Sequence, residues 1–334
     1  MTFMHKLLGG AAALAMSATA ALAEPALMYD LGGKFDKSFN EAAYNGAKRW
    51  AEETGNSYRE IEVTAEAQRV QFATRLAEAG FNPIVVLGFQ NAATIEEVAP
   101  KYPDTSFAII DVTWLGDLPN VRQIGFQEHE GSYLVGMLAA MATESNTVGF
   151  IGGMDVPLIR HFACGYAQGA KAVNPDITVV ANMTGTTPAA WNDPVKGGEL
   201  TKAQISQGAD VVFAAAGGTG VGVLQAAADA DVLSIGVDSN QNHLHPGKVL
   251  TSMLKRVDNA VYDVFNDGVD GFEAGVTVMG LDNDGVGYAV DENNEALISA
   301  DMMAAVDDAK AKIISGELEV ASYYETDSCP ALDF

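Results

Sequence analysis

The sequence predicts an α/β protein of two lobes, each a parallel sheet covered on both faces by helices. From Ala26 onward, short apolar runs alternate with longer segments of helical period, which is the pattern of repeated βαβ units. The alternation nearly completes one sheet by residue 126 and then begins a second cycle. With 334 residues, of which 48% are apolar, the chain is long enough for one large domain or two domains.

The first cycle accounts for one doubly wound lobe. Its strands are expected at 26–29, 57–61, 83–87, 106–110 and 121–126. Its helices are expected at about 38–54, near 65–80 and near 91–101. Because helical stretches separate most of these strands, the strands are expected to run parallel.

The second cycle repeats the architecture without repeating the sequence. It begins with a helix at 130–141, strands are expected at 147–152, 178–182, 210–214 and 233–237, and the run 249–254 follows them. Further helices of this cycle are expected near 158–173, 194–208 and 219–230. After it we expect a helix at 258–266, a hairpin-like region at 275–290 that turns at Asp282–Gly285, and a last helix at 300–315. Two lobes of this kind suggest a cleft where strand C-termini from both sheets meet a ligand.

Residues 1–23 read as a secretory signal peptide. Lys6 precedes a short apolar stretch that ends in Ala21-Leu22-Ala23, and this order of charge, apolar core and small residues is typical of an export signal. A membrane anchor would need a longer and more apolar segment. We expect cleavage after Ala23, and no cysteine near that position offers a site for a lipid.

The charge balance argues against some partners. The chain has 19 Lys and Arg against 44 Asp and Glu, which gives a formal net charge of −25. Binding to nucleic acid or to an anionic membrane surface requires clustered basic residues, and here these are confined to short pairs such as Lys255-Arg256. We therefore expect no nucleic acid partner and a soluble, solvated surface.

The cysteines leave two alternatives. Cys164 and Cys329 are the two cysteines of the chain, and in an exported protein such a pair is a candidate disulfide. This bridge would tie the C-terminal tail to the body of the protein. Cys164 alone would otherwise read as a buried thiol.

The segment Tyr29–Asn40 is the strongest candidate for a binding loop. It leaves the first strand, turns on Gly32-Gly33 and enters a helix at Ser38. Asp30 at the strand end is suited to accept hydrogen bonds from a ligand, and Phe39 in the first helical turn offers a ring face. The plainer alternative is that Ser38 caps the helix and Phe39 belongs to the core.

Polar residues and glycines follow other strands in the same way. These are Asp111, Gly217, Gly218 and Asp238. The glycine stretch from Gly217 departs from the dinucleotide fingerprint and lacks a P-loop lysine, so we expect a close approach to a neutral ligand and no nucleotide cofactor. His243 and His245 have no third ligand nearby in the sequence, and no nucleophile motif is present, which favours binding over catalysis or a metal site.

Three motifs resemble those of the basic membrane protein family of ABC-transporter substrate-binding proteins, whose purine nucleoside receptor is the type example. They are Asp30-Leu31-Gly32-Gly33 with Asp36–Asn40, Gln127–Gly136, and Thr251–Asp258. The resemblance runs in order over the whole chain after Ala23. It implies a type I periplasmic-binding-protein fold whose two lobes are joined by a three-crossing hinge and close on the ligand.

The resemblance also implies a division of the chain. The N-terminal lobe would comprise 24–126 and about 256–285, and the C-terminal lobe 127–255 and about 286–334. A periplasmic receptor without the family's lipid-bearing cysteine would diffuse freely and present its ligand, as a monomer, to an inner-membrane ABC permease.

The implied site residues are carried over position by position. Asp30 and Asn40 would contact the base, Phe39 and Trp191 would stack on its faces, Asp111 would hydrogen-bond the ligand, Gly217 or Gly218 would bring backbone close, and Asp238 with Lys255 would hold the ribose hydroxyls. Trp191 stands where a smaller ring is usual. Riboflavin, a pentose or another metabolite is therefore an alternative ligand, and an exported nucleoside hydrolase is the rival of another class.

Overall fold

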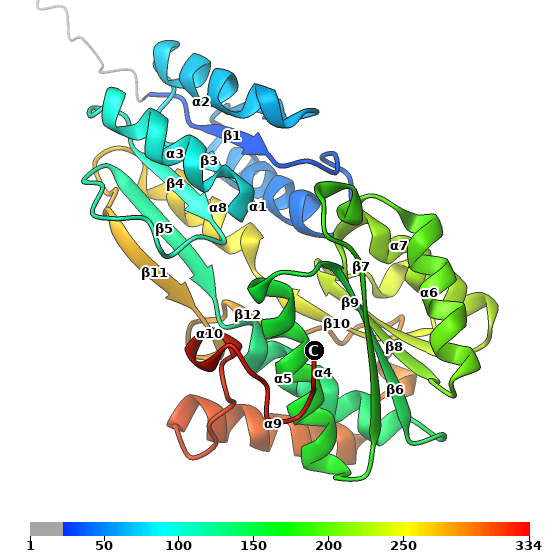
Figure 1. Cartoon of the computed structure of the whole chain (residues 1–334). Helices are drawn as coiled ribbons and strands as arrows, with labels where there is room; N and C mark the ends of the chain where they lie inside the picture. The colour runs from blue at the N-terminus through cyan, green and yellow to red at the C-terminus, as the bar shows by residue number, and fades with distance from the viewer. Residues whose placement is uncertain (1–22) are drawn as a thin grey trace, which may run out of the picture.

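The computed structural model describes residues 23–334, and within them the strands form two six-stranded sheets (Figure 1). The expected architecture of two α/β lobes is confirmed. The predicted signal peptide lies almost wholly in residues 1–22, outside the described residues. Within the described range no helix has both the length and the apolar character needed to cross a membrane.

The first lobe is built on a parallel sheet of order β11-β5-β4-β3-β1-β2. Its strands are β1 (Ala26–Tyr29), β2 (Arg59–Glu62), β3 (Ile84–Val86), β4 (Phe107–Ile110), β5 (Val121–Phe126) and β11 (Gly275–Met279). Its helices are α1 (Phe39–Thr54), α2 (Arg69–Glu78), α3 (Ala92–Val98) and α8 (Val257–Asp267). Most elements lie within a few residues of their expected positions.

The second lobe has the order β12-β10-β9-β8-β6-β7, in which β12 runs antiparallel to β10. Its strands are β6 (Thr147–Met154), β7 (Thr178–Gly185), β8 (Val211–Ala215), β9 (Leu233–Asp238), β10 (Val249–Lys255) and β12 (Val286–Tyr288). Its helices are α4 (Glu128–Ala142), α5 (Pro157–Val173), α6 (Pro194–Ser206), α7 (Gly220–Asp229), α9 (Ala300–Ser315) and α10 (Tyr323–Thr326).

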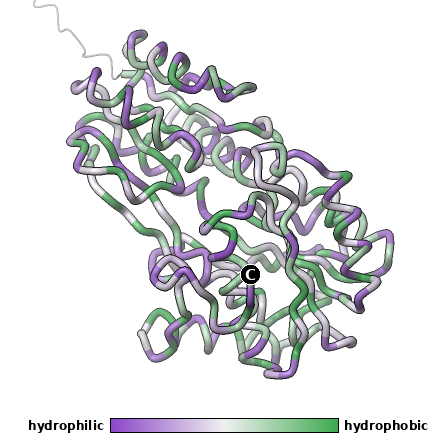
Figure 2. Tube along the Cα trace, in the orientation of Figure 1, coloured by the Kyte–Doolittle hydropathy of each residue, from purple (hydrophilic) through white to green (hydrophobic). Residues whose placement is uncertain are grey.

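The inner strands β1, β3 and β4 of the first sheet are buried on both faces, as a helix-covered parallel sheet requires, whereas the edge strands β2 and β11 are largely exposed. In β1, Leu27 and Tyr29 pack on the side of α1, whereas Ala26 and Met28 pack on the side of α2 and α3. All are fully buried. Figure 2 shows the same contrast along the chain: the inner strands are mostly hydrophobic, and the outer helices mix both classes.

The chain passes between the sheets three times in the described part. It leaves β5 for α4, leaves β10 for α8, and leaves β11 for β12. The expected hairpin at 275–290 is therefore wrong, because β11 pairs with β5 and β12 pairs with β10 in different sheets. A short 3₁₀ turn at Leu281–Asn283 joins them. The exact lobe boundaries stay a prediction.

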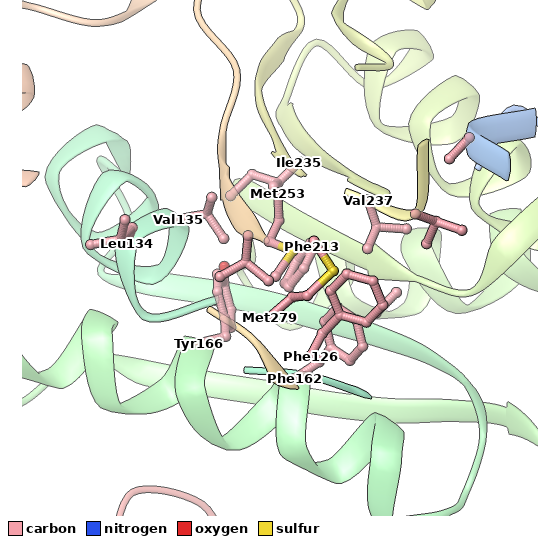
Figure 3. Packing of buried hydrophobic residues seen from close by; sticks show 14 of the residues in the cluster. Phe126, Leu134, Val135, Phe162, Tyr166, Phe213, Ile235, Val237, Met253 and Met279 are labelled. Carbon is pink, nitrogen blue, oxygen red and sulfur yellow. The ribbon is translucent and has the colours of Figure 1, made fainter. Parts of the chain in front are cut away.

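Apolar side chains fill the space around these crossings. Phe126 at the end of β5, Met279 at the end of β11 and Met253 in β10 belong to one buried cluster with Phe162 of α5 (Figure 3). Each of these side chains is at least nine-tenths buried. The strands that precede the three crossings, β5, β10 and β11, therefore all contribute to one packed apolar core.

Helices α4 and α5 approach each other closely because glycines lie at their contact. A Cβ atom on Gly165 would fall 2.2 Å from the carbonyl oxygen of His129, and one on Gly169 would fall 1.9 Å from that of Tyr133. No larger residue fits at either position without a shift of backbone. This packing sets the N-terminal turn of α4 against the first half of α5.

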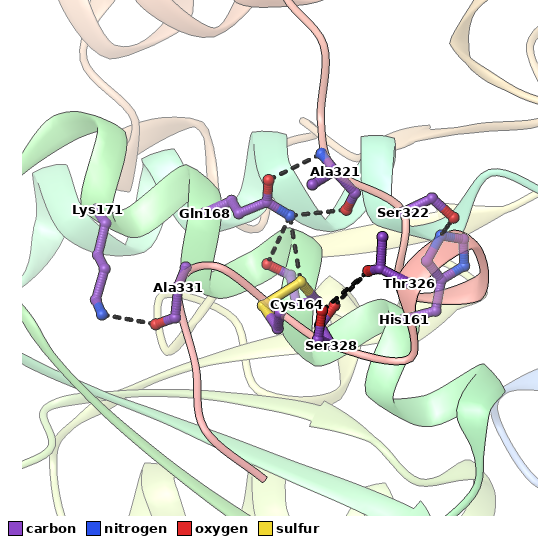
Figure 4. The surroundings of a disulfide bond; sticks show 10 residues. His161, Cys164, Gln168, Lys171, Ala321, Ser322, Thr326, Ser328 and Ala331 are labelled. Carbon is purple, nitrogen blue, oxygen red and sulfur yellow. Dashed lines mark hydrogen bonds between the residues drawn. A yellow bond between two sulfur atoms is a disulfide. The ribbon is translucent and has the colours of Figure 1, made fainter.

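The C-terminal segment is fastened to α5. The sulfur atoms of Cys164 and Cys329 are bonded, with their Cα atoms 5.5 Å apart (Figure 4). Gln168 donates a hydrogen bond to the carbonyl of Ala321 and accepts one from its N–H, each at 2.9 Å. The tail thus lies along α5, and α10 reaches the ends of β5 and β11 (Figure 1).

Candidate functional site

A cavity lies between the lobes at the C-terminal ends of the parallel strands. It encloses about 630 Å³ of space, including the part open to solvent. The sequence-predicted residues that line it are Asp30, Phe39, Asn40, Asp111, Trp191, Gly217, Asp238 and Lys255. We call this space the cleft cavity. Gly218 lies just behind its wall, where a Cβ atom would be 3.3 Å from the carbonyl oxygen of Trp191.

The loop between β1 and α1 is held by its own side chains. The Asn40 amide donates to the carbonyls of Asp30 and Gly33 and accepts from the Asp30 N–H, at 3.1–3.2 Å. The Asp36 carboxylate accepts from the N–H groups of Ser38, Asn40 and Glu41 at the start of α1. Asn40 is thus already engaged in shaping the loop, which leaves its amide little capacity for a ligand.

Asp30 is supported by a buried arginine that sequence reasoning missed. Arg69 at the start of α2 places Nη1 2.8 Å from Asp30 Oδ1, and its Nη2 donates to Gln90 at 2.6 Å. Gly88 lies against the same carboxylate, since a Cβ there would be 2.3 Å from Asp30 Oδ2. The Asp30 carboxylate therefore lies between the Arg69 guanidinium and the backbone of Gly88.

Aromatic side chains enter the cleft cavity from both lobes. Phe39 comes from the first turn of α1, and Trp191 ends a 3₁₀ turn before α6. The Trp191 ring lies against Gly153, where a Cβ would be 2.1 Å from the ring. Two further rings line the cavity and have no counterpart among the sequence-predicted residues: Phe89, after β3, and Phe162 of α5. Together these residues offer flat apolar surface to a planar group.

Lys255 is the central cation of the cleft cavity. Its Nζ lies 2.6 Å from Asp111 Oδ1 and 3.2 Å from Glu128 Oε1. Phe39, Phe126 and Phe162 surround it, with ring centroids 5.1–5.6 Å away. At 2% exposure the ammonium has lost nearly all water, so the carboxylates must replace its hydration.

Asp238 faces Lys255 from the end of β9 and also joins the lobes. Its Oδ2 accepts a hydrogen bond from the Ser38 hydroxyl of the first lobe. Next to it, the Ser239 hydroxyl donates to the Ser38 carbonyl at 2.9 Å, and Gln241 donates to the Lys37 carbonyl at 2.8 Å. These contacts bring the lobes together at one rim of the cleft cavity.

Burial shifts the pKa values of the cleft carboxyls. Burial raises the pKa of Asp36 to about 7, although hydrogen bonds from backbone N–H groups act to lower it. It raises the pKa values of Asp111 and Asp238 to about 6, although Lys255 opposes both shifts. Burial would lower the pKa of Lys255, but the charges of Asp111, Glu128 and Asp238 raise it instead. Lys255 therefore stays charged throughout the neutral range.

These shifts predict a stability that falls as the pH rises. A carboxyl with a higher pKa in the folded chain binds more protons when folded, so the free energy of unfolding decreases between the unfolded value of about 4 and the folded one. We expect the ligand-free protein to melt several degrees lower at about pH 7.5 than at about pH 5. Asp36→Asn should make this decline shallower.

The control is Asp155→Asn. Arg160 lowers the pKa of Asp155, which is therefore ionised over the whole interval in both states. Its substitution should leave the slope between these two pH values as in the wild type, and thermal melts in matched buffers provide the measurement. A wild-type melting temperature that climbs over this interval would contradict the prediction.

The arrangement suits reversible recognition of a neutral, hydroxyl-bearing planar molecule. Carboxylates accept hydrogen bonds from hydroxyl or amino groups, the ammonium donates one, and the rings cover flat faces. Among residues 23–334, no group of three or more His, Cys, Asp or Glu side chains is placed to hold a metal ion.

Comparisons with known proteins identify the family of the chain. The sequence model of the Bmp family, described as ABC transporter substrate-binding protein PnrA-like, matches residues 24–323. The chain is 35% identical to the CD4+ T-cell-stimulating antigen of Listeria monocytogenes, over 88% of this chain and 87% of that one. It is 32% identical to the ABC transporter nucleoside-binding protein BmpA of Lactococcus lactis, over 89% and 88%.

A solved structure of a solute-binding protein has a similar fold. The crystal structure of an ABC transporter solute-binding protein from Aeropyrum pernix superposes with a TM-score of 0.82 at 30% identity, covering 91% of this chain and 95% of that one. Two α/β lobes with a cavity between them define the class of type I solute-binding proteins. The chain belongs to the Bmp family of ABC-transporter substrate-binding proteins.

Proposed function

We propose that the protein binds a purine nucleoside in the cleft cavity and delivers it to the permease of an ABC importer. One observation carries the proposal: the cleft cavity gathers aromatic rings together with Lys255 and strand-end aspartates. Rings suit a base, and an ammonium between carboxylates suits the two ribose hydroxyls, each of which both donates and accepts. The name of the Lactococcus relative supports the same ligand class.

We also propose where the protein acts and in which oligomeric state. We infer that the chain is exported and cleaved after Ala23, because residues 1–23 have the pattern of a signal peptide. We infer that it is free in the periplasm, because no cysteine lies at the cleavage site to carry a lipid. It acts as a monomer, since a receptor of this class presents both lobes to its permease. Binding proceeds without turnover.

The test is a thermal-shift and calorimetric screen of residues 24–334 against nucleosides, free bases, riboflavin and pentoses, with product analysis of every hit. A nucleoside at 100 times its dissociation constant should add about 2.7 kcal/mol to the free energy of unfolding, with no product formed. A response to riboflavin or a pentose alone would replace the ligand assignment. Released free base would make the protein an enzyme.

A matched pair of variants links the screen to the cleft cavity. Phe39→Ala should weaken nucleoside binding about 10-fold or more, because stacking on a ring contributes about 1–3 kcal/mol. Phe35→Ala, four residues earlier and 62% exposed outside the cavity, should leave the affinity unchanged. Equal effects of the two substitutions would argue against a stacked base on Phe39.

A further inference from the structure

Glu128 is bound to the cleft lysine without lining the cleft cavity. It is the first residue of α4, directly after the first hinge crossing, where the helix N-terminus favours a negative charge. Its Oε1 lies 3.2 Å from Lys255 Nζ, and its side chain is 1% exposed. Burial would raise the pKa of Glu128, but Lys255 and a hydrogen bond from His161 lower it. The residue is therefore a buried, ionised partner of Lys255.

The other oxygen of Glu128 is held by His161. The Nδ1 atom of His161 lies 3.2 Å from Glu128 Oε2, and its Nε2 lies 3.2 Å from the Ser322 hydroxyl in the C-terminal segment (Figure 4). Nδ1 can donate a hydrogen bond to Glu128, and Nε2 can share one with the Ser322 hydroxyl. Both nitrogens of the fully buried ring are then satisfied.

The ring of His161 is also fixed on its faces. It stacks on His129 at 4.2 Å between centroids, and Tyr324 of α10 lies 4.3 Å away on a tilted plane. The close α4–α5 packing places His129 next to His161, and the Cys164–Cys329 disulfide ties down the chain beyond Ser322 and Tyr324. His161 therefore has no free rotation with which to release Glu128.

Lysine needs such support because its side chain has four rotatable bonds and carries a compact charge. An ammonium has three N–H donors, and carboxylates at the distances of Asp111 and Glu128 leave one of them for another acceptor. Asp111 lines the cleft cavity, whereas Glu128 lines only the neighbouring pocket beside α10 and is held there by His161. Glu128 is thus the contact that can stay constant as ligand enters and leaves.

We propose that Glu128 and His161 are positioning residues of the ligand site, which hold the Lys255 ammonium so that its remaining N–H meets a ligand hydroxyl. This inference rests on the proposed nucleoside ligand, since it assigns the Lys255 contact to the ribose. It predicts that disturbing Glu128 weakens binding of a ligand with both hydroxyls and spares a ligand without them.

The experiment compares Glu128→Gln with Glu130→Gln by calorimetric titration of a ribonucleoside and of its 2′,3′-dideoxy analogue. Glu128→Gln should weaken ribonucleoside binding about 10-fold or more and change dideoxy binding less than about 3-fold. Glu130 lies two residues further along the same helix and accepts a hydrogen bond from the Leu281 N–H. It has no contact with Lys255, so Glu130→Gln should bind both ligands as the wild type does. His161→Gln should act in the same direction as Glu128→Gln.

A second measurement requires no ligand. A buried, ion-paired ammonium exchanges its protons slowly, so the Lys255 Nζ signal should be visible in heteronuclear NMR spectra of the wild type and of Glu130→Gln. In Glu128→Gln, or in His161→Gln if the former does not fold, this signal should shift and broaden. An unchanged signal overturns the inference whatever the ligand is.

The outcomes separate the two proposals. Wild-type protein that binds no nucleoside contradicts the proposed function, and the NMR comparison then decides the positioning role alone. If the wild type binds ribonucleoside, an equal loss for both ligands in Glu128→Gln, or no loss for either, overturns the positioning role. A loss confined to the ribonucleoside supports it.

Discussion

Replacing Lys255 with Met should reduce the free energy of unfolding by about 3–5 kcal/mol at neutral pH and remove ligand binding. The substitution keeps the unbranched apolar part of the side chain but leaves Asp111, Glu128 and Asp238 buried without the positive charge they share. Asp111 and Glu128 have exchanged water for contact with the ammonium, Asp238 loses the positive charge near it, and none of the three gains a new partner. The loss is the cost of unpaired buried charge.

The stability of this variant should depend on pH because of the same buried carboxylates. Without Lys255 the cleft carboxyls have pKa values further above those of the unfolded chain, so they are protonated and neutral in acid and charged in base. The destabilisation should be larger at about pH 8 than at about pH 5. Denaturant unfolding at both pH values measures it, and Asp111→Asn added to Lys255→Met should recover part of the loss.

Lys34→Met is the matched control. Lys34 is also ion-paired, at 2.6 Å from Glu60, and lies 4.0 Å from the Tyr44 ring centroid, but Glu60 is open to solvent. Its loss should therefore cost about 1 kcal/mol or less and leave binding intact. If Lys255→Met proves as stable as Lys34→Met at alkaline pH, the buried carboxylates do not depend on the cleft lysine.

The position of the cleft could be predicted because it follows from topology. The carboxyl ends of parallel strands meet at one edge of each sheet, so Asp30, Asp111 and Asp238 could be expected to converge without knowledge of any contact. The backbones of Asp111 and Asp238 are left-handed, with φ of 67° and 63°, which aspartate tolerates better than most residues. The residue type and its place after a strand were the signals.

The supporting residues could not be predicted, because their partners are distant in sequence. Arg69 reaches Asp30 from another helix, and His161 reaches Glu128 across 33 positions. Glu128 stood inside a recognised motif, but nothing in that motif indicates that it would contact Lys255. These contacts depend on how helices pack, as at Gly165 between α4 and α5, and such packing has no local sequence pattern.

The prediction of a hairpin at 275–290 is wrong for a related reason. A strand, a short turn and a strand look alike in sequence whether the strands pair with each other or with two separate sheets. At 275–288 the outcome depends on β5 and β10, which are far away in the chain. Asn40 illustrates the opposite case, because contacts within ten residues of it occupy the side-chain amide that the sequence predicts to contact the ligand.

Removing the side chain of Asp238 should lower nucleoside affinity about 100-fold, because hydrogen bonds to an ionised group contribute about 1.5–3 kcal/mol each. Asp238→Gly is the suitable change, since glycine accepts the left-handed backbone at this position without strain. Burial has raised the pKa of Asp238 to about 6, which shows that its charge is held against a desolvation penalty. The fold should therefore tolerate the loss, with a melting temperature near that of the wild type.

Asp238 also accepts a hydrogen bond from Ser38 across the lobes, so a loss of affinity has two possible origins. Ser38→Ala removes the interlobe contact and keeps the carboxylate. If the carboxylate acts on the ligand, Ser38→Ala should bind a ribonucleoside within a few-fold of wild type, and the penalty in Asp238→Gly should shrink for a dideoxy analogue. Matching losses in the two variants would instead assign Asp238 to closure of the lobes, and its place among the ribose contacts would have to be given up.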